Sequence, residues 1–130
     1  MKRYLLDTHV VIWALGQPRK LSVRTKALLQ TEDIHVSALS LWEILTKQMR
    51  GKVLVDSRTL CDHIGRAGIK MLPMTGEHVE NGLALDGLHG DPFDRILVGT
   101  ARVEQMVLLT RDAQILDLAP PLLGPLLQEA

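Results

Sequence analysis

The sequence predicts an α/β fold with a central parallel sheet, and two features point to that class. Short apolar runs alternate with helix-like stretches along the chain, which is the order expected of βαβ units. The runs are rich in Leu, Val and Ile, as expected of strands that helices cover on both faces. A chain of 130 residues without a repeat or linker is expected to form one domain, 1–130.

The first half of the chain is predicted to hold two strands and three helices. A strand at 4–6 leads into a short helix at 10–15, which the Gly-Gln-Pro stretch at 16–18 ends. Apolar residues at helical spacing predict an amphipathic helix at 21–30, and the next apolar run predicts a strand at 34–36. Ser37 is a suitable N-cap for a helix that continues through Met49 and that Gly51 closes.

The second half continues the alternation. The predicted elements are a helix at 59–67, a strand at 69–74 that Pro73 interrupts, a helix at 77–85, a loop at 87–90, a helix at 92–105, a strand at 106–109 and a last helical turn at 112–116. The tail at 118–130 is rich in Leu and Pro, and Pro120, Pro121 and Pro125 argue against a regular helix or a central strand there. The sequence leaves open whether this tail packs on the core or contacts a partner.

Composition excludes several classes of protein. The one cysteine, Cys61, excludes an internal disulfide and fits a reducing compartment. The first apolar run stops at Asp7, too early for a signal peptide, and no apolar stretch approaches the ~20 residues that span a bilayer, so we expect a cytoplasmic protein with no membrane partner. The 15 basic and 15 acidic side chains cancel. If the substrate is a polyanion, something other than a basic surface must meet its charge.

Four aspartates each have a simple structural explanation when they are taken one at a time. Asp7, Asp91 and Asp112 each stand just before a predicted helix, where an aspartate caps free backbone N–H groups. Asp94 falls in the first turn of its helix, where negative charge suits the helix dipole. Taken singly, these explanations are more probable than a functional role.

Glu43 lies nearly two turns inside its helix and is too far in to cap it. It shares one face with Ser40, Thr46 and Lys47 by three- and four-residue spacing. Its simplest structural explanation is a solvated ion pair with Lys47, worth a few tenths of a kcal/mol.

The joint placement of four acids is what the separate explanations leave unexplained. Ligands of a parallel sheet bind beyond the carboxyl ends of its strands. Asp7 ends the first strand, Asp112 follows the strand at 106–109, Asp94 opens a helix, and Glu43 lies in the helix after the strand at 34–36. Carboxylates gathered at one edge repel one another unless some keep a proton or a cation joins them. Oxygen ligands without a matching His or Cys pattern favour Mg²⁺ or Mn²⁺ over zinc.

Other chemistries find little support in the sequence. It contains no HExxH pattern, no glycine-rich phosphate loop and no GxSxG motif.

Four blocks of the sequence resemble the signature blocks of PIN-domain proteins, with the greatest similarity to the VapC toxins of type II toxin–antitoxin modules. They are LLDTHVVIWAL at 5–15, VSALSLWEILTK at 36–47, HGDPFDRILVGTA at 89–101 and LLTRD at 108–112. The blocks stand in the order of the family and span most of residues 4 to 112. Two features depart from the family's pattern: Arg111 stands inside the Thr-x-Asp block, and the proline-rich tail is unlike the family's usual final strand.

The resemblance implies an α/β/α sandwich and a Mg²⁺-dependent endoribonuclease, with Mn²⁺ as a possible substitute. It also implies an RNA substrate, a cognate antitoxin protein as partner, and a homodimer as the expected assembly. The residues carried over are an acidic quartet, Asp7, Glu43, Asp94 and Asp112, and two supporting residues, Thr8 and Thr110.

Within the quartet, the resemblance makes Asp7, Asp94 and Asp112 the metal ligands. Glu43 either orients or deprotonates the attacking water, or completes a second metal site. The alternative is a PIN-like binding module that docks RNA or a protein without cutting. A phosphate-handling α/β domain of the receiver or phosphatase type is less well matched, because it needs paired acids at the first strand, where Thr8 and His9 follow Asp7.

Overall fold

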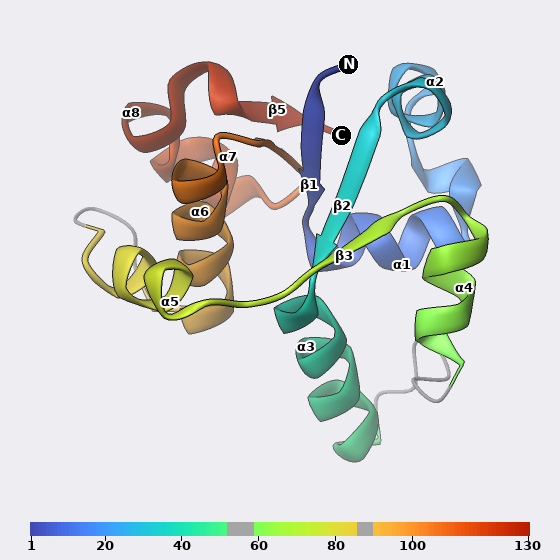
Figure 1. The fold of residues 1–130 in the computed structure, drawn as a ribbon, viewed down its shortest axis with the longest axis horizontal. Coiled ribbons are helices and arrows are strands. Elements are labelled where there is room, and N and C mark those ends of the chain that lie inside the picture. The colour runs from blue at the N-terminus through green and yellow to red at the C-terminus, as the bar shows by residue number, and fades with distance from the viewer. Residues whose placement is uncertain (52–58, 86–89) are drawn as a thin grey trace.

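The structure is a computed structural model that describes residues 1–51, 59–85 and 90–130. Five strands form one sheet in the order β3-β2-β1-β4-β5, and every neighbouring pair is parallel (Figure 1). The strands are β1 (Arg3–Leu6), β2 (Asp33–Ser37), β3 (Lys70–Leu72), β4 (Val107–Thr110) and β5 (Leu127–Glu129). The predicted parallel sheet is therefore confirmed.

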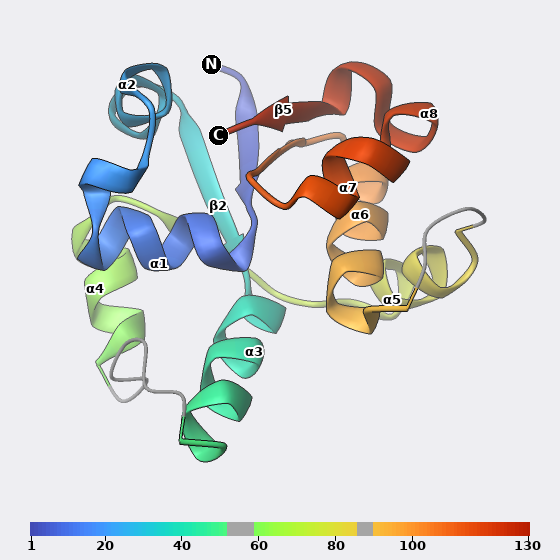
Figure 2. The same cartoon turned by 180° about the vertical axis from the view of Figure 1, so that it is seen from behind.

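Helices pack on both sides of the sheet, as in the predicted α/β/α sandwich (Figures 1 and 2). One side carries α1 (Thr8–Gly16), the short 3-10 helix η1 (Pro18–Lys20), α2 (Val23–Thr31) and α4 (Leu60–Arg66). The other side carries α5 (Gly76–Leu83), α6 (Pro92–Glu104), α7 (Ala113–Leu118) and α8 (Pro120–Leu123). Helix α3 (Ala38–Met49) follows β2 and extends away from the ends of the strands.

The strands supply apolar side chains to two separate cores. In β1, Tyr4 and Leu6 belong to the core under α1 and α4, while Leu5 between them belongs to the core under α6 and α7. Strand β4 divides in the same way, with Leu109 in the first core and Leu108 in the second. Successive side chains of a strand point to opposite faces, so continuous apolar runs are what a sheet covered on both faces requires.

Most predicted helices and strands lie within two residues of the observed ones, and the differences have local causes. Helix α1 begins at Thr8, two residues earlier than predicted, because Asp7 caps it. Helix α2 begins at Val23, because the Ser22 hydroxyl accepts a hydrogen bond from the Thr25 backbone N–H. Strand β3 stops at Leu72, because the proline that follows has no N–H to offer the sheet. The predicted loop at 87–90 lies outside the described residues except for its last glycine.

The tail corrects an expectation from the sequence, because it does provide a final strand. Strand β5 pairs in parallel with β4 at the edge of the sheet, after a second 3-10 helix, η2 (Gly124–Leu126). Pro120 opens α8, a position that needs no N–H donor, and Pro125 lies in η2 rather than in the strand. Leu123 and Ala130 are buried. The prolines did exclude a central strand, but they leave room for a short edge strand.

None of the helices in the described ranges is long and apolar enough to cross a membrane.

Helices α5 and α6 approach each other closely enough that two glycines touch. A Cβ atom on Gly99 would lie 2.5 Å from the Gly82 backbone nitrogen, and one on Gly82 would lie 2.7 Å from the Arg95 carbonyl oxygen. The Arg95 side chain donates to the carbonyls of Gly82, Leu83 and Leu85, which caps the end of α5. Helix α6, which carries Asp94 in its first turn, is thereby fixed against α5.

We expect Gly99→Ala to destabilise the fold by about 1–3 kcal/mol, because the obstructing atoms are backbone and cannot rotate away. A matched control is Gly65→Ala in α4, where a Cβ would have nothing within 4 Å. That variant should gain stability, by up to about 1 kcal/mol, because alanine favours helix. Urea unfolding of both variants measures the difference. A gain of stability in Gly99→Ala would contradict the close approach.

Candidate active site

The sheet register brings the ends of three strands to one edge. Leu6 of β1 pairs with Val36 of β2 and with Leu109 of β4, so the residues that follow these three lie side by side. The Asp7 backbone N–H still donates to the Leu109 carbonyl at 3.0 Å. The register therefore places Asp7 beside Ser37 and Thr110 at the carboxyl edge of the sheet.

Asp7 is the most buried of the predicted acids, with 4% of its surface exposed. One carboxylate oxygen accepts from the Thr8 backbone N–H at 2.6 Å, and the other accepts from the Thr110 hydroxyl at 2.6 Å. Burial raises the pKa of Asp7 above its ordinary value, the two hydrogen bonds lower it, and the negative charge of Glu43 raises it further. The side chain is thus held in a fixed position in which burial disfavours its negative charge.

Glu43 is buried beside the first turn of α1. The Thr8 hydroxyl donates to Glu43 Oε1 at 2.5 Å and is also hydrogen-bonded to the Ser40 hydroxyl at 3.0 Å. The other carboxylate oxygen lies 3.4 Å from Lys47 Nζ. The predicted pair with Lys47 exists, but it is not the solvated surface pair of the simple explanation, because Glu43 is only 8% exposed. Ser40 was placed on this face by helical spacing, but its bond to Thr8 depends on tertiary contact.

Asp91 and Asp94 have different environments. Asp91 is exposed and caps α6, accepting from the backbone N–H of Phe93 at 2.9 Å and of Asp94 at 3.5 Å. Among the described residues, no side chain or backbone group donates a hydrogen bond to the Asp94 carboxylate. Burial, together with the negative charges of Asp91, Asp7, Asp112 and Glu43, raises the pKa of Asp94 to about 7. Asp94 therefore lies within electrostatic reach of every other predicted acid.

Asp112 caps α7 and is tied to Asp7 through one hydroxyl group. Its Oδ1 accepts from the backbone N–H groups of Gln114 at 2.9 Å and Ile115 at 3.0 Å. The Asp112 backbone N–H donates to the Thr110 hydroxyl at 3.0 Å, and this same hydroxyl donates to Asp7. The Thr110 hydroxyl thus links Asp7 to Asp112 and fixes their relative position.

The residues present fit a divalent cation by charge and by donor type. Four carboxylates lie at one edge of the sheet. Among the described residues, Lys47 is the one base that forms an ion pair with any of them. Within the described ranges, no three acidic, His or Cys side chains are already close enough to one another to enclose an ion. An ion held here would therefore bind through one or two of these carboxylates and complete its shell with water. Their oxygen atoms suit Mg²⁺ or Mn²⁺, which bind through few protein carboxylates and keep several waters.

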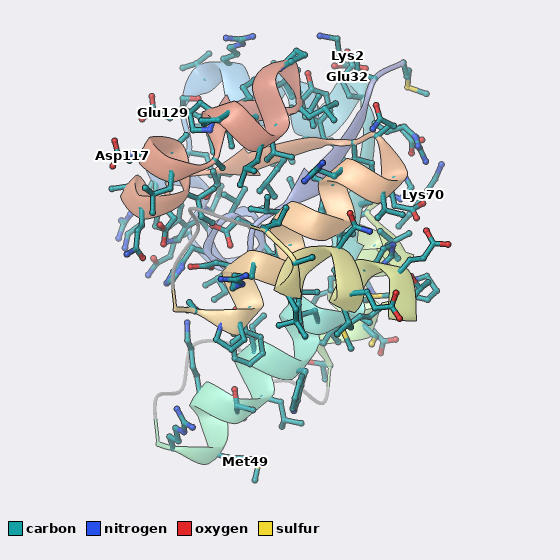
Figure 3. All side chains as sticks on the ribbon, turned by 90° about the vertical axis from the view of Figure 1, so that its left-hand side faces the viewer. Lys2, Glu32, Met49, Lys70, Asp117 and Glu129 are labelled. Atoms are coloured by element: carbon teal, nitrogen blue, oxygen red, sulfur yellow. The ribbon has the colours of Figure 1, made fainter. Side chains whose placement is uncertain are left out.

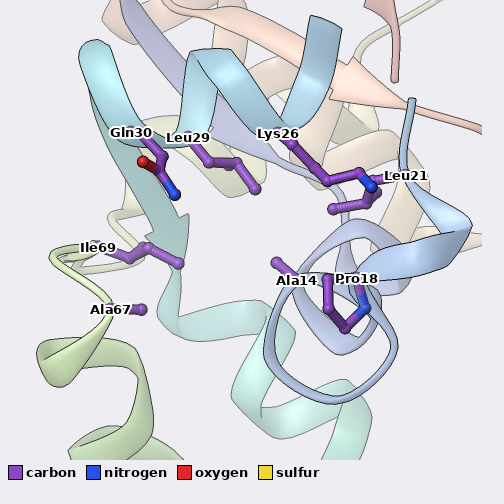
Figure 4. A pocket seen from close by; sticks show the side chains of 8 residues that line it. All are labelled: Ala14, Pro18, Leu21, Lys26, Leu29, Gln30, Ala67 and Ile69. Carbon is purple, nitrogen blue, oxygen red and sulfur yellow. The ribbon is translucent and has the colours of Figure 1, made fainter. Parts of the chain in front are cut away.

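A separate cavity lies among α1, η1, α2 and the chain after α4. Its volume is about 310 Å³, and Figure 4 shows its lining. Four of its residues are Ala14, Leu21, Leu29 and Ile69. The lining contains no acidic residue, so this cavity does not belong to the acidic site.

Comparison with known proteins agrees with these observations. A family model described as PIN domain matches residues 4–120. Ribonuclease VapC22 of Mycobacterium tuberculosis is 28% identical over 123 residues, which are 88% of this chain and 91% of that protein.

Two solved structures share the fold. VapBC2 from Rickettsia felis, bound to a DNA fragment from its promoter, gives a TM-score of 0.68 at 17% identity and covers 98% of each chain. DNA-bound VapBC from Salmonella typhimurium gives a TM-score of 0.67 at 20% identity and covers 99% of this chain and 98% of that one.

Proposed function

Because the chain belongs to the PIN domain family, as its four sequence blocks predicted, we propose that it is a metal-dependent endoribonuclease and the toxin of a type II toxin–antitoxin module. The observation that carries this proposal is the convergence of Asp7, Glu43, Asp94 and Asp112 on one edge of the sheet, with raised pKa values for Asp7 and Asp94. The similarity to Ribonuclease VapC22 supports RNA as the substrate. The whole chain, 1–130, serves as one such domain.

In this proposal, Asp7 and Asp94 hold Mg²⁺, or Mn²⁺ in its place, and Asp112 contributes directly or through a water. The bound ion supplies positive charge that polarises the phosphodiester and stabilises the charge that develops on its oxygens. Asp94 is the acid best able to turn toward an ion, because no described group donates to it. Thr110 keeps Asp7 and Asp112 in register through its hydroxyl.

Glu43 acts on the attacking water or completes a second metal site. Thr8 holds one of its oxygens and Lys47 faces the other, so its carboxylate keeps one orientation. A general base must lie within hydrogen-bond reach of the proton it accepts, and a fixed carboxylate meets that condition without reorganisation.

The cognate antitoxin is the proposed protein partner, and a second copy of this chain is the other. Both solved neighbours named above are VapBC proteins. Four carboxylates favour an antitoxin that brings Arg or Lys into the acidic site. Helix α3 also exposes apolar surface for a partner to cover, because Leu45 is 42% exposed and Met49, at the far end of the helix, is 79% exposed (Figure 3).

The test uses the purified protein, free of antitoxin, on single-stranded and looped RNAs. We expect cleavage with Mg²⁺ or Mn²⁺, none after chelation, and silencing by the small protein encoded beside it. Because the net charge is zero, RNA affinity should fall less steeply with salt than it does for a basic RNA-binding protein. Intact RNAs across a broad panel with either metal would instead favour a binding module that does not cut.

A further inference from the structure

A second, smaller cavity is lined in part by one of the four acids, Asp112. Its volume is about 250 Å³, and His9, Trp13, Arg111 and Asp112 line it. Asp112 also belongs to the acidic site, and His9 follows Thr8 in the first turn of α1. The cavity and the acidic site therefore share Asp112.

Arg111, which lines the cavity, and Lys20, which lies beside it, both face the Trp13 ring. Arg111 Cζ lies 5.6 Å from the centroid of the Trp13 ring, and Lys20 Nζ lies 5.7 Å from it. The His9 ring is 6.0 Å from the Trp13 ring and tilted by 48°. Trp13 is half-buried against the core under α1, so it is a fixed surface on which the exposed side chains rest.

Arg111 is held in place without using most of its hydrogen-bonding capacity. Its Nη1 donates to the Lys20 backbone carbonyl at 2.9 Å, which fixes the guanidinium between η1 and α1. A guanidinium has five N–H donors in a planar fork that suits phosphate oxygens. Within the described residues, one of these five N–H donors of Arg111 has an acceptor, the Lys20 carbonyl.

The position of Arg111 argues against a purely structural role. It stands between Thr110 and Asp112, yet it forms no ion pair with any of the acids in the described ranges. An arginine that served only to neutralise this site would pair with a neighbouring carboxylate. Arg111 is bound instead to a carbonyl and an aromatic face, which leaves its charge available to an anion from outside.

We infer that this cavity is a nucleotide subsite for single-stranded RNA beside the scissile phosphate, in which Arg111 and Lys20 bind a backbone phosphate and the His9 and Trp13 rings contact the adjoining base. This inference rests on the proposed ribonuclease function and names how that site holds its substrate. Proteins recognise single strands through cations that follow the phosphates and flat side chains on which bases stack. The subsite also supplies local positive charge that the neutral chain lacks overall.

Tryptophan fluorescence tests the subsite without any need for cleavage. The chain has two tryptophans, so Trp42→Phe leaves Trp13 as the only reporter and keeps an aromatic ring beside Phe93. With metal chelated, adenosine 5′-monophosphate should change the Trp13 emission, and ribose 5-phosphate, which lacks the base, should bind at least about fivefold more weakly. Equal binding of the two ligands would overturn the inference.

Substitutions of Arg111 test whether adenosine 5′-monophosphate binds at this cavity. Arg111→Ala should weaken the binding of adenosine 5′-monophosphate at least about fivefold, and Arg111→Lys should fall between it and the parent because it keeps the charge but loses the planar fork. The matched control is Arg102→Ala, an exposed arginine in the last turn of α6, at the opposite end of that helix from Asp94. Unchanged affinity in Arg111→Ala would overturn the inference.

Cleavage kinetics separate this inference from the proposed function. On a single-stranded RNA, Arg111→Ala should lower kcat/KM at least about fivefold, mainly through a higher KM, because the residue contacts a flanking nucleotide. If the wild type cuts RNA while Arg111→Ala keeps the parent KM, the subsite is wrong and the ribonuclease stands. If the wild type cuts nothing while its binding of adenosine 5′-monophosphate depends on Arg111, the nucleotide site stands, but the ribonuclease and the place of this site beside a scissile phosphate are wrong.

Discussion

Asp94→Asn should abolish RNA cleavage while Asp91→Asn keeps most of it, although the two residues are three positions apart. Asp91 uses Oδ1 to accept backbone N–H groups at the start of α6, and asparagine caps a helix about as well as aspartate. Asp94 accepts no hydrogen bond from the described residues and faces the other acids. Changes to groups that only support metal ligands cost about 10–100-fold, so losing a ligand should cost at least about 100-fold.

The comparison requires that both variants fold. Circular dichroism and urea unfolding should show intact proteins, because each substitution keeps the shape of the side chain. As a further control, Asp91→Ala should lose about 1 kcal/mol of stability, since it removes the cap. An equal loss of cleavage in Asp91→Asn and Asp94→Asn would make Asp91 a metal ligand as well and would end this division of roles.

Local signals in the sequence explain why so much of the fold could be predicted. Helix caps such as Asp91 and Ser37, and apolar runs such as the one in β4, are set by neighbours in the chain. The four acids were grouped because parallel strands bring their carboxyl ends to one edge, which needs only the fold class. Order along the chain was therefore enough to predict that these acids lie at this edge of the sheet.

Contacts that depend on the exact register of distant elements could not be predicted. The Thr110 hydroxyl donates to Asp7, which lies 103 positions earlier in the sequence, and no local sequence pattern predicts that hydrogen bond. The contact between Gly82 and Gly99 likewise depends on which two helices meet and at what point. The prolines of the tail excluded a central strand, but this local rule could not show that the last residues pair with β4 as a short edge strand.

The metal-free protein should lose stability as the pH rises from about 4 to about 7, and Asp94→Asn should remove much of that loss. The pKa of Asp94 is about 7 in the fold, against an ordinary value of 3.8. Between these values the unfolded chain has released the proton that the folded chain still holds, so the free energy of unfolding falls with pH. The pKa of Asp7 is also raised, so that residue acts in the same direction.

The difference between the two pKa values of Asp94, about 7 minus 3.8, corresponds to an upper limit of about 4 kcal/mol. Asp94 is only partly buried, so solvent screening should reduce the observed effect to about 1–2 kcal/mol. Urea unfolding at pH 5, 6, 7 and 8 in chelator measures it in both proteins. A variant that follows the wild type across this range would show that the Asp94 charge is not what destabilises the metal-free fold.

Without metal, Asp94→Asn should be more stable than the wild type near pH 7, and Mn²⁺ should reverse this order of stability. The cation attracts the carboxylates that otherwise repel one another. Binding to the folded state alone raises stability by mass action, about 2.7 kcal/mol when the ion is at 100 times its dissociation constant. The wild type should gain more at pH 8 than at pH 6, because Asp94 must release its proton to bind the ion. Asp94→Asn should gain little at either pH. Equal shifts of the melting temperature in both proteins would place the ion away from Asp94, and the acids would then need another explanation.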